Sequence, residues 1–150
     1  MKRHPVLARF SREHHKALLT AQYIKTDAPA FRGMPFSLAG KQEYVLRFFQ
    51  EHLKNHFQQE EAILFLWVRK MKPEMAGLID ELVAEHRAIE TLIRKIESND
   101  DIETQLDVLG RLMELHIRKE ERILFQQLQE KLSTEEFAAI ENQLTFDNGK

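Results

Sequence analysis

Apolar side chains recur every three to four residues along four long segments of the chain, which is the spacing of one face of an α-helix. We expect helices over about residues 5–27, from Ser37 to about residue 70, over about 73–97 and from about Asp100 onward, with a short last helix from near Ser133. Most links between these helices are short, so neighbours should run antiparallel. The pattern therefore predicts an all-α fold: an antiparallel up-down-up-down four-helix bundle with a short C-terminal helix.

Local signals place several helix ends. Ser37 is a good N-cap residue, and Pro73 suits the first turn of a helix. Two pairs have the spacing of a capping box, Asp100 with Glu103 and Ser133 with Glu136. Residues 145–150 should be frayed. No long tract rich in proline, glycine or serine divides the chain, so residues 1–150 should form a single domain.

Two copies of the pattern H-x3-E-E-x-I-L-F stand sixty residues apart, beginning at His56 and His116. Residues four apart on a helix lie one turn above each other, so each copy places an imidazole and a carboxylate together. These pairs, His56 with Glu60 and His116 with Glu120, fall within the apolar stripes of their helices. A buried carboxylate without a partner is costly, and a cation would satisfy both groups of each pair.

The other two long helices each offer one inward histidine. His86 lies in the apolar stripe of the third predicted helix. Aligning residues 13–17 with 85–89 matches His14 to His86, which favours His14 over the adjacent His15 as a metal ligand. Three histidines have a glutamate four residues later, and such pairs are also common as surface ion pairs. A metal site is favoured because the motif is repeated, because the histidines fall within the apolar stripes, and because each long helix offers one histidine.

His52 lies one turn before His56 on the same side of the second predicted helix. The second copy has Leu112 at the corresponding position. We therefore interpret His52 as a histidine packed below the site, with an additional ligand as the alternative.

Composition narrows the chemistry. The 150 residues include no cysteine, which excludes disulfides, thiolate zinc sites, iron–sulfur ligation and covalent c-type haem. Imidazole and carboxylate without thiolate suit iron, manganese or zinc. The net charge of −2 indicates no nucleic-acid or anionic-membrane partner, and no run of eighteen apolar residues occurs. We expect a cytoplasmic protein; the sequence indicates neither its redox partner nor its oligomeric state.

The order of these motifs resembles that of the haemerythrin-like, or HHE cation-binding, domain: histidine on helix 1, H-x3-E on helix 2, histidine on helix 3 and H-x3-E on helix 4. The resemblance covers essentially the whole chain. It implies a four-helix bundle with a non-haem centre of two iron ions. It also implies terminal ligands His14, His56, His86 and His116, with Glu60 and Glu120 bridging the ions.

One position departs from the pattern of the oxygen-carrying haemerythrins. The resemblance to that family would imply a fifth histidine one turn after the helix 3 ligand. That position here is Glu90. Glu90 has three possible roles: a metal ligand, a hydrogen-bond partner of a ligand imidazole, or a carboxylate at the edge of the core. Fewer histidines would leave more open positions on the metal, which favours redox, nitric oxide or iron-handling chemistry over reversible oxygen carriage.

Three classes of function follow. Our preferred hypothesis is a di-iron protein that binds or senses dioxygen or nitric oxide, or handles iron. The second is a di-iron redox enzyme with ferroxidase, peroxidase-like or iron-centre repair activity. The third is a metal-free helical interaction module. A ferritin-like centre is disfavoured because its E-x2-H pairs are absent.

Overall fold

The computed structural model describes residues 2–148, and all regular secondary structure in that range is helical. The α-helices are α1 (Pro5–Ile24), α2 (Leu38–Phe48), α3 (Lys54–Gln59), α4 (Phe65–Met71), α5 (Ala76–Glu97), α6 (Ile102–Lys119), α7 (Phe125–Lys131) and α8 (Thr134–Asn148). A 3₁₀ turn over Pro73–Met75 precedes α5. Three π-helical turns interrupt the long helices, at Phe49–Leu53, Glu60–Leu64 and Glu120–Leu124.

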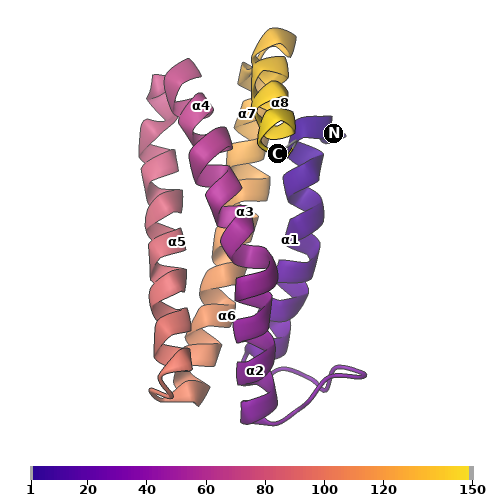
Figure 1. Cartoon of the computed structure of the whole chain (residues 1–150), viewed down its shortest axis with the longest axis vertical. Helices are drawn as coiled ribbons and strands as arrows, with labels where there is room; N and C mark the ends of the chain where they lie inside the picture. Colours follow the sequence, from indigo (N-terminus) through magenta and orange to yellow (C-terminus); the bar gives the residue numbers. More distant parts are fainter. Residues whose placement is uncertain (1, 149–150) are drawn as a thin grey trace.

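These segments build four long helices, as the sequence predicted. The π-helical turns join α2, α3 and α4 into one continuous helix, called here the second long helix (38–71), and join α6 to α7. Figure 1 shows the four long helices running side by side with alternating direction, and α8 at the end where α1 begins. This arrangement confirms the four-helix bundle with a short C-terminal helix. None of the helices within residues 2–148 is long and apolar enough to cross a bilayer.

Two of the predicted caps form. The Ser37 hydroxyl accepts the backbone N–H of Gly40 at 3.1 Å at the start of α2. At the start of α8, Ser133 accepts the N–H of Glu136 at 3.1 Å, and Glu136 in turn accepts the N–H of Ser133 at 2.9 Å. This reciprocal pair is a capping box. The backbone is helical through Asn148, and residues 149–150, the last of those predicted to fray, lie outside the described part.

The predicted capping box of Asp100 with Glu103 is wrong. Asn99 adopts a left-handed conformation, with φ of 62°, and the N–H of Asp100 bonds to the carbonyl of Lys95 at 2.9 Å. These are the features of a Schellman motif that closes the C-terminus of α5. Asp100 therefore belongs to the end of one helix, and Asp101 precedes α6 without a side-chain cap.

The hydrophobic core is divided into two clusters along the bundle axis. The first includes Phe10, Leu82 and Phe125, together with three side chains of α8: Phe137, Ile140 and Leu144. The second lies toward the opposite end and includes residues such as Tyr23, Leu106 and Met113. Between the two clusters lies a layer of buried histidines and glutamates. The fold therefore places polar side chains at mid-height of an otherwise apolar interior.

A glycine sets the distance between α1 and α6. A Cβ atom at Gly110 would lie 2.6 Å from the carbonyl oxygen of Ala21 and 3.2 Å from a side-chain carbon of Ile24. One turn further along α6, Glu114 forms an ion pair with Lys25 of α1 at 2.6 Å. The missing side chain at Gly110 thus permits the close approach of α1 and α6, which hold His14 and His116.

Gly110→Ala should lower the free energy of unfolding by about 1–3 kcal/mol, because the new methyl group overlaps a backbone atom that cannot move freely. The measurement is urea denaturation followed by circular dichroism. Gly77→Ala, in the first turn of α5, is the matched control, since a Cβ there meets nothing within 4 Å. Equal stabilities of the two variants would contradict this close approach.

Candidate metal centre

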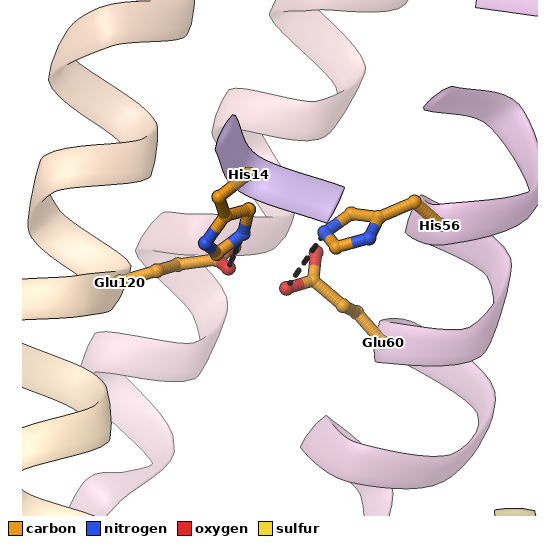
Figure 2. A group of neighbouring side chains, drawn as sticks. All are labelled: His14, His56, Glu60 and Glu120. Carbon is orange, nitrogen blue, oxygen red and sulfur yellow. Dashed lines mark ion pairs between the residues drawn. The ribbon is translucent and has the colours of Figure 1, made fainter. Parts of the chain in front are cut away.

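Six of the side chains selected from the sequence lie together in the polar layer. Each is buried, with a relative exposure of 4% or less: His14, His56, Glu60, His86, His116 and Glu120. They come from all four long helices: α1, the second long helix, α5, and the helix formed by α6 and α7. Figure 2 shows His14, His56, Glu60 and Glu120 pointing toward one another. The predicted inward orientation of all six is therefore confirmed.

The repeated motif explains how each glutamate is placed. Glu60 and Glu120 each begin a π-helical turn, a form that occurs often at functional sites. In the first copy the N–H of Phe65 bonds to the carbonyl of Glu60, five residues earlier, so both residues face the interior. The phenylalanine that ends each motif stacks on a histidine of another helix at 5.7 Å: Phe65 on His86 and Phe125 on His14. In each copy of the repeat, the spacing thus places a glutamate in the centre and a phenylalanine against a histidine that is a candidate ligand.

The six side chains form two overlapping groups of donors. His14 and His56 belong to one group and His86 and His116 to the other, while Glu60 and Glu120 belong to both. The donor atoms of each group lie within 4.8 Å of one another.

Each glutamate directs its two oxygens toward histidines of different groups. The Glu120 oxygens lie 3.0 Å from Nε2 of His14 and 2.7 Å from Nε2 of His116. The Glu60 oxygens lie 3.4 Å from Nε2 of His56 and 3.1 Å from Nε2 of His86. This geometry offers two neighbouring cation positions with two shared carboxylates.

The inward atoms of this layer have no hydrogen-bond partner among the described residues. They are Nε2 of His14, His56, His86 and His116, and both oxygens of Glu60 and Glu120. Leaving a buried polar atom unpaired costs about 1–3 kcal/mol, and more for a charged group. Imidazole nitrogens and carboxylate oxygens are good ligands for first-row metal ions. A metal would therefore bind the atoms that the protein leaves without a hydrogen bond, and the donor set fits iron.

A family model described as the hemerythrin HHE cation binding domain matches residues 5–128. The chain belongs to this family. The match begins at the first residue of α1 and ends within α7, so it includes all six inward side chains. Neither the curated proteins nor the solved structures compared with the chain include a match. The buried donor groups and the family together establish this HHE domain as a metal-binding protein.

A second set of glutamates, called here the outer carboxylates, holds the far side of each histidine ring. Their contacts to Nδ1 are Glu121 to His14 at 2.5 Å, Glu61 to His86 at 2.6 Å, Glu85 to His116 at 2.7 Å and Glu13 to His56 at 3.5 Å. Each glutamate comes from a different long helix than its histidine, and together the four contacts form a closed ring around the bundle. A carboxylate on Nδ1 fixes the ring orientation and leaves Nε2 free to bind a metal.

Three outer carboxylates are themselves held by cations. Arg3 contacts Glu121 at 3.1 Å, Arg87 contacts Glu61, and Lys119 contacts Glu85. Burial disfavours ionisation of Glu85, but hydrogen bonds from His116 and Lys119 outweigh this effect and lower its pKa. Glu85 is therefore held in its ionised form beside His116.

The surrounding carboxylates make the centre strongly attractive to positive charge. Burial disfavours the charged imidazolium, yet contacts with glutamates outweigh burial and raise the pKa of His14 to about 9 and that of His56 to about 10. Burial also lowers the pKa of His86, but contacts with glutamates, mainly Glu120 and Glu60, outweigh burial and raise it to about 11. In the protein without metal, protons would occupy the positions that a cation fills in the loaded protein.

The sequence analysis missed the outer carboxylates, although doublets in the sequence mark them. Glu61 and Glu121 directly follow the inward glutamates, and Glu13 and Glu85 directly precede inward histidines. Adjacent residues on a helix point about 100° apart, so one can face the centre while the other reaches the next helix. The four doublets could therefore have indicated that one residue of each faces the centre and the other contacts a neighbouring helix.

The three less certain candidates lie outside the donor groups. His15 is exposed on α1. Glu90 is partly exposed and forms an ion pair with Arg87 at 2.7 Å, which agrees with a carboxylate at the edge of the core. The expectation that His52 packs below the site is wrong, because His52 is exposed. His52 lies within the π-helical turn Phe49–Leu53, whose buried side chains are Phe49 and Leu53.

Glu85→Ala should weaken metal binding about 10–100-fold, because His116 loses the carboxylate that orients it. Competition with a chromophoric chelator measures the affinity. Glu81→Ala is the matched control: Glu81 also contacts Lys119, but it makes no contact with a histidine of the centre. Equal affinities of the two variants would rule out a positioning role for Glu85.

Proposed function

We propose that this HHE domain holds two iron ions and binds or senses dioxygen or nitric oxide at them, or handles iron. The observation that carries the proposal is the sharing of Glu60 and Glu120 by two donor groups. His14 and His56 would bind one ion, and His86 and His116 the other. The two glutamates would bridge the ions and offset part of their charge.

Four protein donors for each ion suit a reactive centre better than a purely structural one. Iron accepts more than four ligands, and when bound it would supply redox chemistry and open positions for a small ligand. The side chains around it are already fixed in position, because the outer carboxylates hold the histidine rings. The protein's own contribution is thus to orient the donors, to hold negative charge around them and to limit the space for a ligand.

An apolar pocket lies against the centre. His14, His56 and His116 form one side of it, and the apolar lining consists of Ala17, Phe48, Leu53, Phe57, Ile89, Met113 and Ile117, with Glu13 and His52 at its edge. It leaves about 20 Å³ for the centres of water-sized molecules. A space of this size suits a diatomic molecule and is too small for an organic substrate. The pocket favours dioxygen or nitric oxide as the ligand.

Protein expressed with iron and purified without chelator should contain about two iron ions per chain, since the bound metal stabilises the folded state. Mass spectrometry measures the metal. Nitric oxide added to the iron(II) protein should then give a saturable change in the absorption spectrum. Steady turnover of hydrogen peroxide would instead support the redox enzyme, and a folded protein without metal would support the interaction module.

Glu60→Ala and His116→Ala should lose metal and also the stability that metal provides. A ligand of the folded state stabilises it by about 2.7 kcal/mol at a free concentration of 100 Kd. Added zinc or iron(II) should therefore raise the Tm of the wild type and of His15→Ala, the control with an exposed histidine. The Tm of the two centre variants should not respond. A normal metal content in both would refute the assignment of these ligands.

A further inference from the structure

One π-helical turn has no counterpart in the repeated half of the chain. The turns at Glu60–Leu64 and Glu120–Leu124 correspond to each other across the repeat. The turn at Phe49–Leu53 corresponds to residues 109–113, which are regular α-helix within α6. It contains no member of the donor groups. Since such turns often mark functional sites, this one requires a separate explanation.

On the side of α1, two hollows meet at this turn. One is the apolar pocket against the centre. The other, called here the outer hollow, has a volume of about 110 Å³ and is lined by Lys16, Tyr44, Arg47, Phe48, Glu51 and His52. Phe48 and His52 line both hollows. These two side chains therefore stand between the outer surface and the pocket.

His52 is held across the seam between α1 and the second long helix. Its Nε2 accepts a hydrogen bond from the amine of Lys16 on α1 at 3.3 Å. The same amine lies 5.9 Å from the centre of the Phe48 ring. Both His52 and Lys16 are exposed, and exposed side chains change rotamer on the picosecond to nanosecond scale. The contact can thus open without disturbing the core.

The seam is also the loosest part of the ring of outer carboxylates. The contact of Glu13 with His56 joins α1 to the second long helix and, at 3.5 Å, is the longest of the four. The Glu13 side chain is 40% exposed, whereas the other three outer carboxylates are 13–27% exposed. α1 packs mainly against α6, on its other side.

The corresponding position in the second half of the chain is closed. Leu112, which corresponds to His52, packs against the second core cluster. Val108, which corresponds to Phe48, is 44% exposed and does not line the apolar pocket. The opening therefore belongs to one side of a nearly symmetric centre.

We propose that small uncharged ligands enter and leave the apolar pocket through the seam between α1 and the turn Phe49–Leu53, and that His52, held by Lys16, controls their rate of passage. The identity of the ligand rests on the proposed function. The route rests on the two hollows and on the side chains that they share. His52 acts here as an entrance residue and does not bind metal.

An entrance residue has a distinctive kinetic effect. It changes the barrier between the free and bound ligand, so the association and dissociation rate constants change by the same factor and Kd stays constant. A residue that contacts the bound ligand changes Kd, mostly through the dissociation rate. Measuring both rate constants therefore separates the two roles.

Nitric oxide binding to the iron(II) protein, followed by stopped-flow absorption, tests the entrance. His52→Ala should raise both rate constants about fivefold, and His52→Trp should lower them by a similar factor, with Kd unchanged. Lys16→Met should act like His52→Ala, because it removes the hydrogen bond and keeps the aliphatic chain. His15→Ala replaces another exposed histidine that lines neither hollow, and it should have wild-type rates. Unchanged rates in His52→Ala, His52→Trp and Lys16→Met would overturn the proposal. A changed Kd in either His52 variant would also overturn it.

Xenon gives a second readout that does not depend on iron, since apolar cavities in proteins bind it. Its exchange in the zinc-loaded protein can be followed through the NMR signal of the Met113 methyl group, which lines the pocket. Exchange should be faster in His52→Ala and slower in His52→Trp. This result together with no nitric oxide binding would support the entrance and contradict nitric oxide as the ligand in the proposed function. Xenon exchange that is equal in all variants would contradict the entrance.

Discussion

The structure depends on one constraint: two glutamates and four histidines are buried in a single layer between two apolar clusters. Their inward atoms face one another at 2.7–3.4 Å and cannot hydrogen-bond to the surrounding hydrocarbon. The two clusters must then supply enough apolar burial to hold the helices at the distance that the layer requires. A cation turns this layer from a cost into a source of stability, because its charge compensates the buried carboxylates.

The outer carboxylates show how a bundle can fix four imidazole rings with short-range contacts alone. The outer nitrogens of His14, His86 and His116 form hydrogen bonds with glutamates from other helices. The outer nitrogen of His56 forms a longer ion pair with Glu13 of α1. The arrangement couples the four helices into one unit, since displacing a helix affects both its inward donor and a histidine elsewhere. It also explains why acidic residues occur next to the inward side chains in the sequence.

The internal repeat makes the two donor groups nearly equivalent, and the departures from the repeat create the structural difference between the two sides of the centre. The motif provides one shared glutamate and one supporting phenylalanine in each half. The extra π-helical turn occurs in one half only, and the apolar pocket and the outer hollow both border on it. The extra turn thus gives one half of a nearly symmetric scaffold a hollow on the side of α1.

The sequence by itself determined the helices, their alternating directions and the inward face of each, because helical periodicity is a property of the local chain. The pairing of His56 with Glu60 and the caps at Ser37 and Ser133 follow from spacing alone. Local reasoning failed where two motifs compete for the same residues, as at Asp100, where the end of α5 takes precedence over a cap for α6. It also failed for His52, which lies exposed within a π-helical turn that has no clear signal in the sequence. The outer carboxylates and the pocket were decided only by the tertiary structure, since they depend on the rotation and height of each helix relative to its neighbours, and residue spacing within one helix does not specify either.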